Sequence, residues 1–440
     1  MHRSSASTVP AVRPERPQSF GPIVRVACGH FLELYDFQIF GYYAAAIAAT
    51  FFPSGNEFAS LMLSLTTFGT GFIIRPVGAL VLGPYVDQRG RRAGLLLTLG
   101  LMAAGTVSIA LTPSYASIGL IAPLVVVAGR LVQGLSASVE LGSASVYLYE
   151  TAPPRRRGFY TSWQTGSQAL AVIFSAALGL GLTSWLTSQQ ISRWGWRIPL
   201  VVGCAIIPLL FLLRRSLQET PEFLQRKSHP SRREILSTLR RNWKLMALAA
   251  MFSTTNAVSY FMITAYTPTF GGAVLHLAAK NNMTVLLCVG TLSFIWIPTM
   301  GAVSDRIGRR RVLVTASALL LLTSYPVLSW LVSAPSFSRL MAVELWLTLL
   351  YATYSGARDA FLTEIMPTDV RTAGFSLAHS TAGVFGGFTP AIATLLIHAT
   401  GNRAAPGLWL SFAAVCGLSA TLLLNPSRMA RRSALSASGT

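Results

Sequence analysis

The sequence predicts an all-α membrane protein with twelve transmembrane helices in two six-helix halves. Three observations carry this prediction: the composition, the number of long apolar runs, and a motif that occurs twice. The chain has 440 residues, of which 52% are hydrophobic and only 11% are charged. Soluble domains carry about 25% charged residues, so this composition excludes an ordinary soluble fold.

Twelve apolar runs approach the length of about 20 residues that a helix needs to cross a bilayer. The expected spans are 22–50, 60–86, 93–112, 117–149, 159–186, 196–213, 245–271, 281–304, 312–333, 339–366, 373–400 and 405–425. In chain order, we expect a disordered cytoplasmic tail (1–20), a first six-helix half (21–213), a cytoplasmic linker (214–244), a second six-helix half (245–425) and a cytoplasmic tail (426–440).

The lysines and arginines set the expected orientation. Of the 35 such residues, 26 fall in the tails, the linker and the loops on one side, whereas four fall in the loops on the other side: Arg193, Lys280, Arg339 and Arg403. Cytoplasmic loops carry an excess of these residues, so both termini are expected in the cytoplasm. This placement also accounts for the net charge of +20. We therefore expect no nucleic-acid partner, since no basic domain exists to carry one.

An internal repeat is visible in the loops of the positive side. "GPYVDQRGRR" starts at Gly83 and "GAVSDRIGRR" starts at Gly301, which places Asp87 and Asp305 218 residues apart. A weaker pair, "ETAPPRRRG" and "EIMPTDVRT", has an offset of 214. Duplicated halves are typical of transporters that bind substrate between the halves. The residues expected to form a cytoplasmic gate are Gly83, Asp87, Gly90, Arg91, Arg92, Glu150, Arg157, Gly301, Asp305, Gly308, Arg309, Arg310, Glu364 and Arg371.

The doubled G-x-x-x-D-x-x-G-R-R pattern resembles the signature of the major facilitator superfamily. Longer stretches resemble the metabolite–proton symporters, and most of all the citrate–proton and tricarballylate carriers. They include "GHFLELYDFQIFGYYAAAIAATFFPS", "GRLVQGLSASVELGSASVYLYE" and "LTEIMPTDVRTAGFSLA". The resemblance covers about residues 20–425. It implies the major facilitator fold, proton-driven uptake of an organic acid across a bacterial inner membrane, and a gate that clamps the two halves on the cytoplasmic side.

The chain also departs from the pattern of those carriers. The first helix carries His30, Leu34, Tyr35 and Gln38 in place of the usual residues, the tenth carries Arg358 and Asp359 where apolar residues are expected, and His379 replaces an aromatic residue. These departures leave the identity of the acid less certain than the symport itself.

Four charged residues inside expected helices are candidates for proton coupling: Glu33, Asp36, Arg130 and Glu140. A charge near the bilayer centre costs roughly 2.5–3.5 kcal/mol and is therefore a functional hypothesis by default. Glu33 and Asp36 share roughly one helix face, which we expect to line a water-filled chamber. Burial favours a protonated carboxyl and a nearby arginine favours the ionised form, so a group balanced between them can switch. Fixed ion pairs that never titrate are the alternative.

Arginine suits an organic acid because its planar guanidinium binds carboxylates bidentately and stays ionised. Arg75 lies about 16 Å deep in the second helix, near mid-membrane. The candidate substrate-binding residues are His30, Arg75, Tyr160, Gln164, Gln168, Asn256, Tyr260 and Arg358. Structural ion pairs are the alternative for the arginines, and interhelical hydrogen bonds are the alternative for the neutral polar residues.

We expect the protein to be a monomeric, proton-coupled symporter that imports a di- or tricarboxylate through a lipid bilayer by alternating access. Citrate and tricarballylate are the substrates that we expect before other acids. A symporter for another small organic acid or a zwitterionic osmolyte, an efflux carrier and a non-transporting membrane sensor are the alternatives. We find no Walker loop, nucleophile elbow or metal-ligand spacing. The sequence therefore predicts no enzyme, no metal and no cofactor, with the proton gradient as the driving force.

Overall fold

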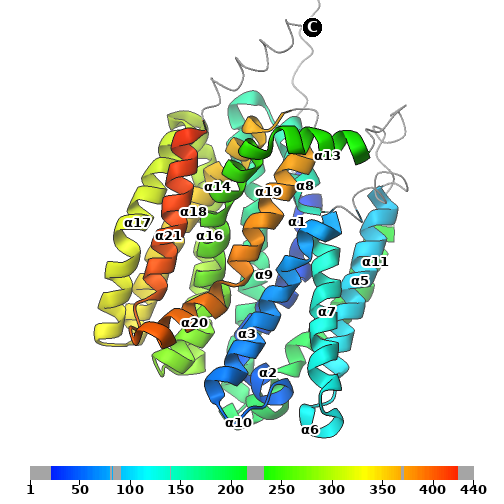
Figure 1. Cartoon of the computed structure of the whole chain (residues 1–440), viewed down its shortest axis with the longest axis vertical. Helices are drawn as coiled ribbons and strands as arrows, with labels where there is room; N and C mark the ends of the chain where they lie inside the picture. Colours follow the sequence, from blue (N-terminus) through cyan, green and yellow to red (C-terminus); the bar gives the residue numbers. More distant parts are fainter. Residues whose placement is uncertain are drawn as a thin grey trace, which may run out of the picture.

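The structure, a computed structural model, describes residues 21–79, 82, 91–138, 140–215, 232–367 and 371–424. These described residues form helices and connecting turns, without a strand among them. Figure 1 shows the long helices lying side by side along the vertical axis of the molecule. We call the end at which α9 and α17 begin the arginine-rich end; α2, α6 and α10 lie at the opposite end.

Helical elements before residue 216 overlap the first six expected spans. They are α1 (Gly21–Tyr42), α2 (Ala44–Phe51), α3 (Glu57–Ile73), α5 (Arg91–Leu111), α6 (Tyr115–Ile118), α7 (Ile121–Ala137), α8 (Glu140–Thr151), the 3₁₀ turn η1 (Pro154–Arg156), α9 (Arg157–Trp185), α10 (Ser188–Gln190), the π-helical η2 (Ile191–Gly195) and α11 (Arg197–Arg215). Several expected spans are therefore built from two consecutive helices rather than one.

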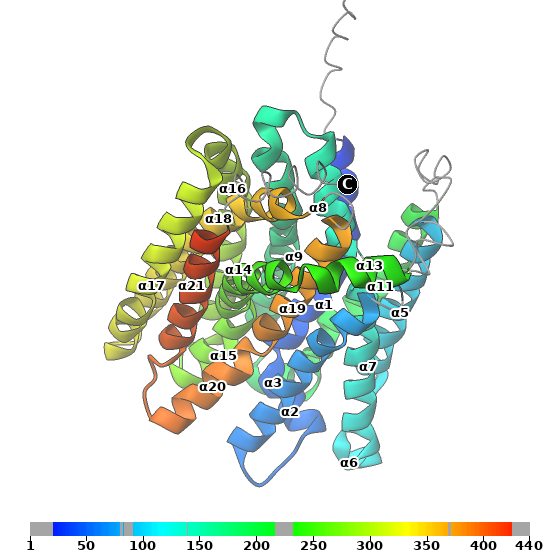
Figure 2. The same ribbon diagram turned by 45° about the horizontal axis from the view of Figure 1, so that its top comes forward.

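The elements after residue 231 follow the same plan. They are α13 (Arg232–Arg241), α14 (Trp243–Phe261), the π-helical η3 (Met262–Tyr266), α15 (Thr267–Thr269), the π-helical η4 (Phe270–Val274), α16 (Ala279–Ile307), α17 (Arg309–Ser333), α18 (Phe337–Ile365), α19 (Arg371–Gly387), α20 (Thr389–Thr400) and α21 (Pro406–Leu423). Figure 2 shows α13 lying across the arginine-rich end, whereas the neighbouring α14 enters the bundle.

Seven helical runs of the described residues are long and apolar enough to cross a membrane. They are Glu57–Ala79, Pro154–Trp185, Trp243–Val274, Ala279–Ile307, Arg309–Ser333, Arg371–Thr400 and Pro406–Leu423. Shorter apolar helices occupy Leu96–Leu111, Ile121–Ala137 and Arg197–Pro208. The protein is thus an all-helical membrane protein.

Breaks within the long runs follow local chemistry. α3 ends at Ile73, and helical backbone resumes at Arg75, immediately before Pro76. Proline has no N–H for the helical ladder, so a break in its neighbourhood is expected. α20 likewise has Pro390 in its first turn, where the missing N–H costs nothing.

Helices α9 and α16 pack closely and join the N-terminal part of the chain to the C-terminal part. A Cβ atom on Gly158 would lie 2.6 Å from the carbonyl oxygen of Gly301, and one on Gly290 would lie 2.8 Å from Ile173. Such contacts need glycine, because any side chain would force the backbones apart. This seam runs from the arginine-rich end into the bundle and sets the distance between the two parts of the chain.

Candidate functional site

The first buried ion pair joins α1 to the helical turn that follows α3. The Nη2 atom of Arg75 lies 3.0 Å from Oε1 of Glu33, and the two residues are 5% and 7% exposed. The guanidinium of Arg75 also lies over the rings of Phe37 and Phe72, at 4.9 and 4.3 Å from their centroids. Aromatic faces attract a cation, so the rings and the carboxylate together hold this arginine inside the bundle.

A second buried pair joins α1 to α7, and its arginine also lies near Phe37. The Nη1 atom of Arg130 in α7 lies 3.5 Å from Oδ2 of Asp36 and donates to Oε1 of Gln133 at 2.8 Å. The amide nitrogen of Gln133 donates in turn to Asp36, and lies 3.2 Å from the hydroxyl of Thr106. Arg130 is therefore linked to Asp36 both directly and through a neutral amide.

Phe37 contacts both arginines, with its centroid 4.9 Å from the guanidinium carbon of Arg75 and 4.3 Å from that of Arg130. Several polar atoms around it are buried without a hydrogen-bond partner among the described residues, namely Oδ1 of Asp36 and the Nε and Nη2 atoms of Arg130. Buried polar groups are normally paired. These atoms are thus available to bind another group when the site rearranges.

Polar contacts at this depth also connect the two parts of the chain. The amide nitrogen of Gln38 donates to the hydroxyl of Tyr260 at 2.8 Å and lies 3.3 Å from that of Thr264. Asn256 accepts a hydrogen bond from Ser355 at 2.5 Å, within the C-terminal part. Tyr260 thus lies where the two parts meet, whereas Asn256 is tied to α18.

The third buried pair belongs to α18. Arg358 donates to Asp359 at 2.7 Å, and its Nη2 atom lies 2.9 Å from Nδ1 of His379. Thr165 of α9 donates to the other oxygen of Asp359 at 2.8 Å, across the two parts of the chain. Arg358 therefore pairs with Asp359 and His379 rather than with the carboxylates of α1.

The expected polar stripe of α9 is not uniform. Gln164 is 1% exposed, and both atoms of its amide lack a partner among the described residues. Tyr160 is buried in a small cluster with Leu148 and Ala152, and Gln168 is half-buried. Gln164 is the member of this stripe with unused hydrogen-bonding capacity.

Some expected site residues lie outside the part of the chain that the structure describes. Gly83, Asp87 and Gly90 belong to a stretch that is not described. The side chains of His30, Arg91, Arg92 and Glu140 are likewise outside the description, although their backbones are helical. These seven expectations stay predictions.

At the arginine-rich end, the second copy of the doubled motif binds the start of α9. Asp305 accepts hydrogen bonds from the backbone N–H groups of Gly158 and Phe159, at 2.8 and 3.0 Å. A helix N-terminus carries partial positive charge and free N–H groups, so it is a natural partner for a carboxylate. Arg309 lies 3.2 Å from the same carboxylate and also pairs with Glu364.

Tyr149 links the remaining charges of this end. Its hydroxyl accepts from Arg157 at 3.0 Å and lies 3.4 Å from Glu364. Arg371 donates to Glu150 at 3.2 Å, which ties α19 to α8. The contacts of Asp305 with α9, of Tyr149 with Glu364 and of Arg371 with Glu150 cross between the two parts of the chain, whereas those of Arg309 lie within the C-terminal part.

Two members of the expected gate have other roles. Gly308, at φ 96°, makes the turn between α16 and α17, a conformation that favours glycine. Arg310 donates to the backbone carbonyl of Leu422 at 2.9 Å, within the C-terminal part.

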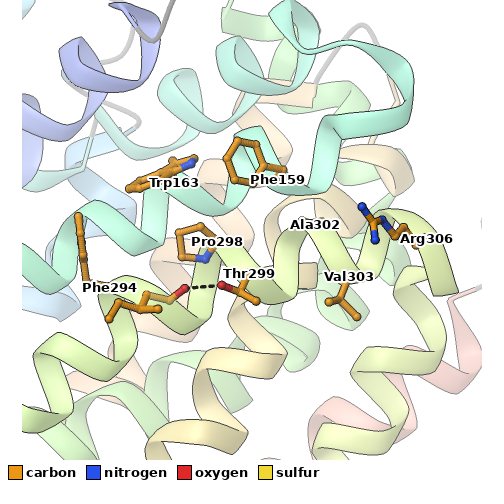
Figure 3. A pocket seen from close by; sticks show the side chains of 9 residues that line it. Phe159, Trp163, Phe294, Pro298, Thr299, Ala302, Val303 and Arg306 are labelled. Atoms are coloured by element: carbon orange, nitrogen blue, oxygen red, sulfur yellow. Dashed lines mark hydrogen bonds between the residues drawn. The ribbon is translucent and has the colours of Figure 1, made fainter.

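Two hollows lie away from the buried pairs. One, of about 330 Å³, is lined by gate residues that include Asp305, Arg309 and Glu364. The other, of about 570 Å³, lies along the seam, where Phe159 and Trp163 of α9 face residues of α16 (Figure 3). Because the charged pairs themselves are buried, a substrate reaches them only after the helices move apart.

Sequence reasoning did not place three residues in these networks: Gln133, Tyr149 and Thr165. Gln133 follows Arg130 by three residues and therefore shares its helix face, which is a signal that the sequence contains. Tyr149 and Thr165 act through contacts between helices that are distant in the chain, and no local pattern marks them.

Comparison with known proteins gives a consistent result. The model of the family described as "Sugar (and other) transporter" matches residues 23–242 and again 226–424. The chain is 53% identical to a citrate–proton symporter of Salmonella typhi over 410 residues, covering 93% of this chain and 94% of the relative. It is 51% identical to a citrate–proton symporter of Klebsiella pneumoniae, covering 96% of each chain.

Solved structures show the same fold. A D-xylose–proton symporter superimposes with a TM-score of 0.72 and 17% identity, covering 92% of this chain and 96% of that one. Another of these structures is titled as a major facilitator superfamily proton:xylose symporter, with the same TM-score. The chain therefore belongs to the sugar (and other) transporter family and has the major facilitator fold.

Proposed function

We propose that this protein is a proton-coupled symporter that imports a di- or tricarboxylate, citrate or tricarballylate above others, across a bacterial inner membrane. The observation that carries the proposal is the two buried arginine–carboxylate contacts whose guanidinium groups both lie over Phe37. The similarity to two citrate–proton symporters supports it. The proton gradient is the driving force, no cofactor takes part, and no chemical conversion of the substrate occurs.

Twelve spans in two halves form the framework of this proposal. The family model matches residues 23–242 and 226–424, so the two matched segments meet at the linker. The excess of lysine and arginine on one side supports a cytoplasmic arginine-rich end with both termini there. The linker 214–244 then joins two six-helix halves that move against each other, and the monomer is the working unit.

Charge balance gives the coupling its physical reason. Arg75 and Arg130 face Glu33 and Asp36, so the cluster is neutral when both carboxyls are ionised. An organic anion that enters a neutral buried cluster loses its hydration, and the weak electrostatic attraction of the cluster does not offset that cost. Protonation of the two carboxyls leaves two arginines without counter-charges, and a substrate with two or three carboxylates supplies them. Proton binding thus raises the affinity for the anion, and proton release lowers it.

Alternating access also requires a closure at the arginine-rich end that can open and close. The links from Asp305 to Gly158, from Tyr149 to Glu364 and from Arg371 to Glu150 hold the arginine-rich end closed in this conformation. Release of substrate into the cytoplasm requires these links to break. Charge-assisted hydrogen bonds at a partly exposed end are weak enough to be exchanged during each cycle.

A zwitterionic osmolyte is the second candidate substrate, because a neutral cluster of two cations and two anions also complements a zwitterion. The chain is 28% identical to a proline/betaine transporter of Salmonella typhimurium, covering 90% of this chain. That substrate needs no protonation of Glu33 or Asp36 to be bound.

A substrate screen in proteoliposomes tests the proposal. Labelled citrate, tricarballylate, α-ketoglutarate and glycine betaine are offered under an imposed inward proton gradient, with and without a protonophore. We expect accumulation of citrate or tricarballylate that the protonophore abolishes. Accumulation of betaine alone would replace the proposal with the second candidate, and binding of citrate without accumulation would indicate a sensor.

A further inference from the structure

Helix α18 carries a buried carboxyl group that none of the interactions described above involves. Glu344 is 5% exposed and lies seven residues after the start of α18 at Phe337, or about 10 Å along the helix. Because α18 ends at the arginine-rich end, Glu344 lies toward the opposite end of the bundle. The sequence analysis did not single out this residue.

The carboxyl group of Glu344 has one hydrogen-bond donor among the described residues, and that donor is shared. The hydroxyl oxygen of Thr267 lies 2.9 Å from Oε1 of Glu344 and 3.0 Å from the backbone carbonyl oxygen of Ile263. A threonine hydroxyl has one hydrogen to donate. Helical threonine commonly donates it to the carbonyl four residues earlier, which here is Ile263. Thr267 therefore divides one hydrogen between Ile263 and Glu344, so Glu344 receives at most one shared hydrogen bond that would stabilise a negative charge.

Among the described residues, no cation pairs with Glu344. The ion pairs among the described residues do not include it, and its Oε2 atom is buried without a partner among them. Titratable or charged groups on α18 and on the elements packed against it interact with residues other than Glu344. Tyr266 contacts Thr394, and Tyr325 contacts Asn402. Arg339 contacts Trp330 and Ser333, and Lys280 is exposed. A lone buried carboxylate is costly, whereas the neutral acid is much less so.

The internal repeat relates Glu344 to a residue of the first half. Glu344 follows Arg130 by 214 residues, the offset that separates Glu150 from Glu364 on the same two spans. In the first half, this position holds the arginine that pairs with Asp36 of α1. In the second half, it holds a carboxyl that bonds to Thr267, between two π-helical turns. Such turns are frequent at functional sites.

We propose that Glu344 is a second proton-binding site of the transport cycle, additional to the carboxyls of α1. The carboxylate takes up one proton from the side opposite to the arginine-rich end, carries it as the neutral acid in the closed conformation seen here, and releases it when that end opens. One proton then crosses with each substrate through the second half of the protein. This inference rests on the proposed symport and adds to it a site and a proton.

The test measures proton and substrate fluxes together in proteoliposomes, with the membrane potential held at zero. Glu344→Gln keeps the shape and a hydrogen-bond donor but cannot titrate, and Glu344→Met offers a nonpolar replacement of similar length. The proton-to-substrate ratio is expected to fall by one in both. Steady-state accumulation should fall about tenfold per pH unit of imposed gradient, because one proton contributes that factor.

Two control variants separate this role from a structural one. Thr267→Val removes the partner but leaves the titratable group, so the ratio should stay at the wild-type value. Glu57→Gln changes an exposed glutamate at the same end of the bundle and should also leave the ratio unchanged. An unchanged ratio in Glu344→Gln or Glu344→Met, beside a wild type that couples protons to citrate, would overturn this inference alone. Absence of coupling in the wild type would instead overturn the proposed symport.

Discussion

Arg130 and Asp36 pair inside the bundle with 3.5 Å between Nη1 and Oδ2, and their side chains are 0% and 2% exposed. The contact is longer than the 3.0 Å between Arg75 and Glu33. Gln133 bonds to both partners and holds the pair together. Because the neutral amide of Gln133 bonds to both residues, Asp36 can become protonated and lose its charge while hydrogen bonds within the network remain.

Asp36→Asn is expected to separate proton coupling from exchange. The amide keeps hydrogen bonds to Gln133 but cannot bind and release a proton. Proton-driven accumulation should fall at least about tenfold, whereas exchange of internal for external citrate should continue, since exchange needs no net proton movement. Counterflow in preloaded vesicles checks this. Loss of both activities in a correctly inserted protein would show that Asp36 has a role other than coupling.

Arg75→Lys is expected to weaken substrate binding more than turnover. Lysine keeps the positive charge but lacks the planar fork that binds a carboxylate bidentately. The KM for citrate should rise about tenfold, corresponding to the loss of about 1.4 kcal/mol of binding. Uptake rates over a range of citrate concentrations measure it. An unchanged KM would exclude direct binding of the substrate by Arg75.

Arg358→Met is expected to destabilise the protein. The substitution leaves Asp359 buried without its cation, and breaking a buried pair in this way costs about 3–5 kcal/mol. The double variant Arg358→Met/Asp359→Leu removes both charges and should recover most of the loss. Thermal unfolding in detergent compares the Tm values of the three proteins. Equal Tm values for the wild type and Arg358→Met would show that the pair does not contribute to stability.

Gly158→Ala is expected to open the arginine-rich end. The new Cβ atom would lie 2.6 Å from the carbonyl oxygen of Gly301 and 2.8 Å from Oδ1 of Asp305, so α9 and α16 must separate. Reaction of a cysteine placed at Ser304, which is buried, with a membrane-impermeant thiol reagent should become several-fold faster. Gly181→Ala on the same helix meets no atom within 4 Å and serves as the control. Equal labelling in both variants would contradict the gate.

Much of the fold follows from the sequence, because the length of an apolar run and the position of its charges directly reflect the bilayer. Each expected span overlaps described helices. The break at Tyr43 and the π-helical turns after Phe261 were not predicted, and no proline marks the break at Tyr43. The sequence marks where an apolar run lies but not where packing interrupts it.

The sequence marks several of the buried charged residues but not how they pair. It places Glu33 and Asp36 on roughly one helix face and leaves the partner of Arg75 open. In the structure, Glu33 pairs with Arg75 near α3 and Asp36 pairs with Arg130 of α7. Residues three apart differ by about 60° around a helix, which is enough to point them at different neighbours. Glu344 needed the structure as well, because its burial depends on the turn that contains Thr267.

Proton uptake on substrate binding tests the central claim most directly. Citrate is titrated into purified protein in buffers of different ionisation enthalpy, and the dependence of the measured heat on the buffer gives the number of protons taken up. At a pH where the α1 carboxyls are ionised, we expect at least one proton per citrate bound, with fewer in Glu33→Gln and Asp36→Asn. Citrate binding with no proton uptake at any pH would contradict the account, because the arginines would then accept the substrate without any change in their carboxylate partners.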